Sequence, residues 1–150
     1  MSERIVVGVD GSEGATSAVR WAAREARLRG AKLELITAWQ LSMYPGAFAM
    51  ASFADEFVNE LAAEAKRKVA EAAEQARAEG GDLDIETRAV EGPSATVLLA
   101  AARVADFLVV GSRGLGGFSE LLLGSVSHQC AHHAPCPVVI VRHRDPSSGT

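Results

Sequence analysis

The stretch GSRGLGGFSELLLGSVS, residues 111–127, combines glycines and serines in a pattern suited to binding phosphate. It directly follows Phe107 to Val110, an apolar run typical of a buried strand. Glycines at the end of a strand permit positive φ angles and let backbone N–H groups approach a ligand without a Cβ in the way. Ser125 then begins a predicted helix, whose first N–H groups lack intrahelical partners and whose dipole is positive at that end. This arrangement predicts an anion site, most naturally for phosphate.

Two common phosphate-binding motifs do not match this segment. The dinucleotide fingerprint G-x-G-x-x-G would need glycine at 114, 116 and 119, but residue 119 is serine, and the segment follows the fourth predicted strand rather than the first. A P-loop closes with Gly-Lys-Ser or Gly-Lys-Thr, and no lysine lies between residues 111 and 127. The spacing present is Gly111-x-x-Gly114, then nine residues, then Gly124-Ser125.

That spacing resembles the nucleotide-binding signature of the universal stress protein family, in its ATP-binding branch. The similarity covers most of the chain, because RIVVGVDGSEGATSAVRWA, EGPSATVLLAAARVADFLVVGSRG and APCPVVIVR also resemble that family. The resemblance implies an ATP-binding stress-response or regulatory module of the adenine-nucleotide α-hydrolase-like superfamily, with slow or no hydrolysis of ATP.

The resemblance also implies which residues meet the nucleotide. Asp10 would lie near the ribose and phosphates and assist Mg²⁺, while the backbone at about Ala38 would meet the adenine edge. Mg²⁺ would follow the phosphates, since it usually takes only one or two protein carboxylates and keeps several waters. The other implied contacts come from Gly111 and Gly114 to ribose and phosphate, and from Gly124, Ser125 and Val126 to the polyphosphate through amides and the Ser125 hydroxyl.

Three of these residues also have simpler interpretations. Asp10 could cap the helix that begins near Ser12, and Ser125 could be an N-cap, which contributes about 1 kcal/mol. Arg113 lies between the first two glycines, where its guanidinium could reach phosphate or point to solvent.

The elements that would position the site alternate along the chain. Segments rich in Val, Ile and Leu alternate with helical patterns, which is typical of βαβ units and of a parallel sheet with helices on both faces. We expect one α/β domain over residues 1–150, Rossmann-like, with an open five-stranded sheet and a flexible tail from about 143 to 150. The resemblance implies the strand order 3-2-1-4-5, which makes Asp10 face Gly111 across the point where the order reverses. The predicted strands are Arg4 to Asp10, Lys32 to Gln40, Leu83 to Glu91, Asp106 to Gly111 and Pro137 to Arg142, and the predicted helices run from about Ser12 to Gly30, over 54–81, from Ser94 to about Val104 and from about Gly124 to His133.

Residues 41–53, LSMYPGAFAMASF, are unusually apolar for a loop. They either pack back on the domain or on a second subunit, or form a mobile flap over a ligand.

Histidines and cysteines cluster in the segment SVSHQCAHHAPCPV. His128 and His132 are one helical turn apart, as metal ligands often are, so a zinc site is one interpretation. Cys130 falls on a different helical face, and Cys136 begins a buried strand between two prolines. Surface histidines and packed cysteines are therefore the interpretation that we favour.

Composition and charge argue against several partners. The chain of 150 residues has a net charge of −4, and its Lys and Arg residues form no stripe interleaved with aromatics, so we expect no nucleic-acid partner. No apolar run of about 18 residues would span a membrane, and no signal-peptide pattern precedes the first strand. Since there are only two cysteines, we expect a cytoplasmic protein.

The resemblance further implies a homodimer joined through Pro137 to Arg142, whose apolar sequence would otherwise be an exposed edge. Two other classes of function stay open: a small ATP-dependent enzyme of the same superfamily with an acceptor site under residues 41–53, and a dimeric interaction protein that binds no nucleotide. The chain has no G-x-S-x-G elbow and no evident base for water, so we expect at most weak ATPase activity or self-phosphorylation. The triggering stress, the downstream partner and the choice among ATP, ADP and other adenylates are not encoded in any motif of the chain.

Overall fold

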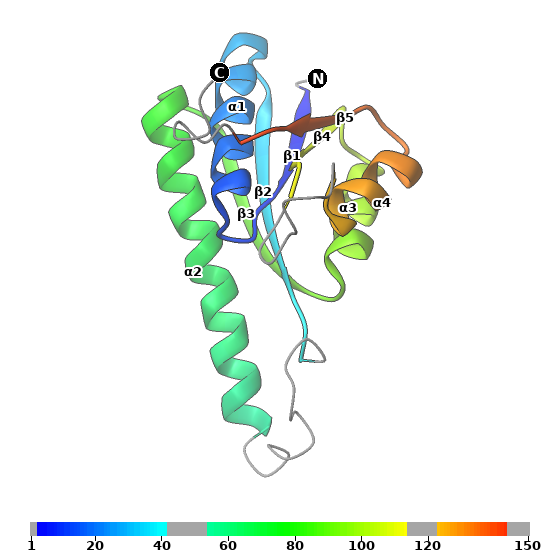
Figure 1. Ribbon diagram of the computed structural model, residues 1–150. Helices are drawn as coiled ribbons and strands as arrows, with labels where there is room; N and C mark the ends of the chain where they lie inside the picture. The colour runs from blue at the N-terminus through cyan, green and yellow to red at the C-terminus, as the bar shows by residue number, and fades with distance from the viewer. Residues whose placement is uncertain (1–2, 42–53, 114–122, 144–150) are drawn as a thin grey trace.

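The computed structural model describes residues 3–41, 54–113 and 123–143. Its centre is a five-stranded parallel sheet in the order β3-β2-β1-β4-β5 (Figure 1), which confirms the predicted fold class and strand order. The strands are β1 (Arg4–Gly8), β2 (Lys32–Trp39), β3 (Ile85–Glu91), β4 (Phe107–Gly111) and β5 (Val138–Val141), and the helices are α1 (Glu13–Arg29), α2 (Ala54–Gly80), α3 (Ser94–Ala102) and α4 (Ser125–His133).

Helices cover both faces of the sheet, as predicted. In Figure 1, α1 and α2 lie on one side of the sheet and α3 and α4 on the other. Because side chains alternate between the faces of a strand, Val7 and its in-register partner Val109 pack under α1 and α2, while Val6 and Leu108 pack under α3 and α4. Two apolar clusters result, one on each face, and they hold the strand ends in place.

The ends of α1 follow its local sequence. Ser12 is the N-cap, and its Oγ accepts a hydrogen bond from the Ala15 N–H at 3.1 Å. Gly30 ends the helix in the left-handed conformation, at φ 64°, and its N–H donates to the Ala26 carbonyl. Ser12 therefore does the capping that one interpretation assigned to Asp10.

The strands are slightly shorter than predicted at the edges that meet loops. β1 ends at Gly8 rather than at Asp10, because the chain turns there: the Val9 N–H still bonds to the Ile36 carbonyl at 2.8 Å, whereas Asp10 already belongs to the turn before α1. β5 begins at Val138 instead of Pro137, although the Pro137 carbonyl still accepts from the Leu108 N–H at 3.0 Å.

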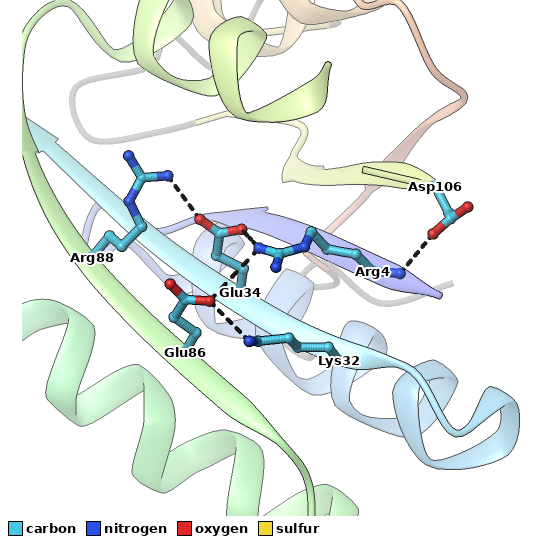
Figure 2. A network of polar contacts seen from close by, with 6 residues as sticks. All are labelled: Arg4, Lys32, Glu34, Glu86, Arg88 and Asp106. Carbon is cyan, nitrogen blue, oxygen red and sulfur yellow. Dashed lines mark hydrogen bonds and ion pairs between the residues drawn. The ribbon is translucent and has the colours of Figure 1, made fainter. Parts of the chain in front are cut away.

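A network of charged side chains links β1, β2 and β3 (Figure 2). The Glu34 side chain is only 2% exposed, and its two carboxylate oxygens accept from Arg4 Nη1 at 2.5 Å and from Arg88 Nη1 at 2.8 Å. Glu86, in register with Glu34, pairs with Lys32 at 3.1 Å, and this hydrogen bond lowers the pKa of Glu86. The buried carboxylate is thus held by two guanidinium groups from neighbouring strands.

We expect Glu34→Gln to lower the free energy of unfolding by about 1–3 kcal/mol, because one buried charge and one acceptor are lost while both arginines stay in place. The loss is smaller than for a fully buried pair, since the side chains of Arg4 and Arg88 are 30% and 45% exposed. Urea unfolding followed by circular dichroism measures the change.

Glu86→Gln is the matched control, since its side chain is 41% exposed, and surface pairs contribute about 0–1 kcal/mol. Equal losses of unfolding free energy in the two variants would show that the burial of Glu34 does not strengthen its ion pairs with Arg4 and Arg88.

Candidate functional site

The strand order reverses between β1 and β4, the position where open parallel sheets bind ligands at the carboxyl ends of their strands. Val7 of β1 lies in register with Val109 of β4, so Asp10 follows the end of β1 and Gly111 is the last residue of the adjacent strand β4. The turn before α1 and the end of β4 therefore lie at the same edge of the sheet, as the strand order implied by the resemblance requires.

The turn between β1 and α1 holds its acidic side chain in a defined place. The Ser12 N–H donates to Asp10 Oδ1 at 2.9 Å, which fixes the carboxylate at the beginning of the turn. Gly11 has φ +85°, a conformation that favours glycine. Lys68 of α2 runs along this glycine, and its Cε would lie 3.4 Å from a Cβ added at Gly11. Lys68 was not predicted as a site residue, since the packing of α2 brings it to the turn.

Two glycines allow α1 to contact the end of β4 directly. A Cβ added at Gly111 would lie 2.8 Å from the carbonyl carbon and 2.9 Å from the carbonyl oxygen of Gly14. A Cβ added at Gly14 would lie 2.7 Å from the Arg113 carbonyl oxygen. Backbone atoms have little room to yield, so both positions require glycine for this approach. Gly14 was not predicted as a site residue, although a glycine in the first turn of an alanine-rich helix was a visible signal.

The Ser112 carbonyl joins the end of β4 to the beginning of α4. It accepts from the Gly124 N–H at 2.6 Å and from Ser127 Oγ at 2.9 Å. Ser127 is only 2% exposed, and the Ser112 N–H donates to the Val141 carbonyl of β5 at 2.9 Å. Both ends of the segment 113–123 are therefore fixed to the same point of the sheet.

The N-terminus of α4 is free of a side-chain cap. Its N-cap is Gly124, in an extended conformation at φ −72° and ψ 167°, and no side chain of the described residues caps it. Ser125 is the first residue of the helix and is exposed, so the interpretation of Ser125 as the N-cap is wrong. Its hydroxyl accepts from Gln129 Nε2 at 3.4 Å. The first N–H groups of the helix, including those of Ser125 and Val126, can therefore serve an external acceptor.

Of the remaining predicted site residues, the structure describes Ala38 and Arg113 but not Gly114. Ala38, the last residue but one of β2, lies in register with Val90 and packs on the α3 and α4 side of the sheet. Arg113 is exposed and is the last described residue before the gap. Gly114 lies outside the described residues, as do the glycines at 116 and 117 and residues 42–53 of the predicted apolar loop.

The cysteine and histidine cluster separates into an inner and an outer set. Cys130 is fully buried on the inner face of α4, and burial raises the pKa of its thiol to about 11, so it is protonated at neutral pH. Burial also raises the pKa of Cys136, which is partly buried, and both thiols are free. His128, His132 and His133 are exposed. Within the described ranges, no three His, Cys, Asp or Glu side chains are grouped to hold a metal ion.

Among the parts of the chain that the structure describes, no helix has the length and apolar character needed to cross a membrane.

Comparison with known proteins identifies one family. The family model of the universal stress protein family matches residues 1–142. A universal stress protein of Mycobacterium tuberculosis is 34% identical over 140 residues, covering 93% of this chain and 48% of the relative. The universal stress protein YxiE of Bacillus subtilis is 32% identical over 150 residues, covering 95% of this chain and all of the relative. The chain spans about half the length of the mycobacterial relatives and the full length of YxiE.

Solved structures of similar proteins share the fold. The universal stress protein UspA of Lactobacillus plantarum has a TM-score of 0.79 at 24% identity, covering 93% of this chain and 97% of its own. A universal stress protein in complex with cAMP is 33% identical, with a TM-score of 0.67 and coverage of 94% and 97%. The Archaeoglobus fulgidus protein in complex with dAMP is 26% identical, with a TM-score of 0.64 and coverage of 93% and 97%.

We expect Gly111→Ala to destabilise the protein by about 1–3 kcal/mol, because the new methyl group meets the backbone of Gly14 and forces α1 away from β4. Urea unfolding measures the loss.

Gly8→Ala is the control, at the end of the neighbouring strand β1 and facing α3 instead of α1. Its methyl group would meet only the side chain of Leu98, with Cδ1 at 2.7 Å, and a flexible side chain can rotate away. A Gly111→Ala protein as stable as the wild type would mean that α1 does not need this backbone approach.

Proposed function

The chain belongs to the universal stress protein family, and on this premise we propose that it binds an adenine nucleotide, ATP together with Mg²⁺, as a regulatory module. The observation that carries the proposal is the junction at Ser112, where the Gly124 N–H bond of 2.6 Å holds the N-terminus of α4, which no described side chain caps, at the carboxyl end of β4, the strand beside β1. A helix N-terminus at a strand-order reversal provides amide donors and a positive dipole for phosphate.

Two similar proteins support an adenine nucleotide as the ligand. The proteins crystallised with cAMP and with dAMP are 33% and 26% identical to this chain and share its fold. Both ligands contain adenine, a sugar and one phosphate. The common chemistry favours a site that recognises the adenosine part and one phosphate, and ATP would add two more phosphates along the loop.

In this proposal each part of the site has one task. The backbone at Ala38 meets the adenine edge, and the Asp10 carboxylate lies near the ribose and phosphates and orients water around Mg²⁺. The phosphates lie along the amides of Gly124, Ser125 and Val126 and the Ser125 hydroxyl, with Gly111 and Gly114 at the ribose and first phosphate and Arg113 at the rim. When bound, Mg²⁺ would neutralise phosphate charge.

The same residues favour binding over rapid hydrolysis. Fast transfer of a phosphoryl group needs a residue that positions water and cations that stabilise the transition state. The glycine-rich segment 111–127 contains no lysine of the kind that P-loop enzymes use on the transferred phosphate. We therefore propose slow or no turnover. A small ATP-dependent enzyme is the alternative, and release of pyrophosphate with a candidate acceptor would favour it.

Calorimetric titration with Mg-ATP, ADP, AMP and cAMP tests the proposal. We expect saturable binding of adenine nucleotides and none of GTP at the same concentration. Ser125→Ala should weaken binding of Mg-ATP about tenfold or more, since a hydrogen bond to a charged group contributes about 1.5–3 kcal/mol, while the stability of this exposed position stays unchanged.

Ser127→Ala is the matched control two residues along the helix. Its hydroxyl donates inward to the Ser112 carbonyl, so the substitution should cost about 1 kcal/mol of stability and affect binding only through the position of α4. A Gly114→Ala, Gly124→Ala double variant, shown to be folded, should lose the binding. No heat and no thermal stabilisation at millimolar Mg-ATP would refute the proposal and leave a dimeric interaction protein as the better interpretation.

We also propose that the protein forms a homodimer through Pro137 to Arg142, in a cytoplasmic setting consistent with its two free thiols. β5 is an edge of the sheet, and its four residues are all partly exposed. The Pro137 carbonyl accepts from Leu108 of β4 and the Val141 carbonyl from Ser112, just after β4, so by alternation the N–H of Ile140 points away from β4 toward the open edge.

Light scattering should therefore find a species of about twice 15.7 kDa, and Ile140→Pro should shift it to the monomer by removing an outward N–H. Ile140→Ala removes the same side-chain packing but keeps the N–H, so it should stay dimeric. A single species of 15.7 kDa in the wild type would contradict the dimer.

A further inference from the structure

The outer face of α4 carries two histidines whose rings already lie against each other. His128 and His132 are separated by one helical turn, and their ring centroids are 4.6 Å apart with an interplanar angle of 59°. Both side chains are exposed. Residues four apart on a helix share a face, so the pair has the spacing of two imidazole ligands to one ion.

The helix that carries the pair is firmly seated. Cys130 is fully buried and Ser127 is 2% exposed, and both lie on the inner face of α4. The Ser127 hydroxyl donates to the Ser112 carbonyl at 2.9 Å, which fixes the helix to the sheet. The outer face therefore presents His128 and His132 from a rigid backbone, so little order would have to be created on binding a metal.

The ring separation suits a single ion. A tetrahedral ion with nitrogen ligands at about 2.0–2.1 Å requires the two nitrogens to lie roughly 3.3 Å apart. Rings with centroids 4.6 Å apart can reach that separation by rotating about χ2 without moving the backbone.

We propose that His128 and His132 form a binding site for a late first-row transition metal ion such as Cu²⁺, Ni²⁺ or Zn²⁺. The described residues offer no third His, Cys, Asp or Glu ligand at this place, so water or an added ligand completes the coordination. Imidazole selects these ions over Mg²⁺, which takes oxygen ligands, so the site is chemically distinct from the Mg²⁺ expected with a nucleotide. The inference does not depend on nucleotide binding.

His133 provides a control on the same helix. Its ring lies 6.1 Å from that of His132, but the two residues are adjacent in sequence and point to different sides of the helix. His133 is also exposed, so substituting it changes the number of surface imidazoles without changing the His128–His132 pair.

The test is titration of the untagged, nucleotide-free full chain with Cu²⁺, Ni²⁺, Zn²⁺ and Mg²⁺, followed by calorimetry and thermal unfolding. We expect one bound ion per chain, with Cu²⁺ the tightest and no binding of Mg²⁺. His128→Ala and His132→Ala should each weaken Ni²⁺ binding at least tenfold and abolish the thermal shift that it causes, whereas His133→Ala should change the affinity by less than twofold.

The partly buried thiol of Cys136 is tested separately by Cys136→Ser, which should keep the binding. Because all three histidines are exposed, the variants should fold, and circular dichroism checks this. The proposal is overturned if His133→Ala weakens binding as much as His132→Ala does, if Cys136→Ser abolishes it, or if no Ni²⁺ binds at millimolar concentration.

Discussion

One backbone carbonyl, that of Ser112, carries the constraint on which the site depends. It accepts from the Gly124 N–H and the Ser127 hydroxyl, and the N–H of the same residue bonds to β5. A carbonyl oxygen has two lone pairs, so both acceptor positions are used at this point. The consequence is that α4 begins at a fixed distance from the end of β4, whatever the conformation of the loop between them.

The second constraint is the absence of side chains where α1 meets β4. Gly14 and Gly111 let two backbones touch, and this contact brings the turn with Asp10 to the same edge of the sheet as Ser125. The two constraints complement each other. The contact between Gly14 and Gly111 positions the acidic turn, and the Ser112 carbonyl positions the first amides of α4. Loops that carry binding residues are effective when a rigid scaffold positions them, and here the scaffold is the reversal of strand order.

Most of the fold could be predicted because each element has a local signal. Apolar runs marked β1 and β4, Gly30 marked the end of α1, and the family resemblance supplied the strand order, all of which the structure confirms. The site residues named from the motif remain predictions, and Gly114 lies outside the described residues. Gly14, Lys68 and Ser127 were missed because their roles come from contacts between distant segments. A serine in a helix gives no indication of which carbonyl it will find, and a lysine on α2 gives none of which turn it will cover.

Glu34 has a consequence for how the sheet assembles. Its side chain shares a face with Val6 and Ile36, while its neighbours Leu33 and Leu35 belong to the opposite apolar cluster. If β2 slipped by one residue during folding, every side chain would change faces, and the carboxylate would enter the alanine-rich layer beneath α1 and α2 without either arginine. An unpaired buried charge costs several kcal/mol, so the sheet with the shifted register would be less stable than the native sheet by that amount. The Glu34 carboxylate thus favours the native register of β2 against a shift by one residue.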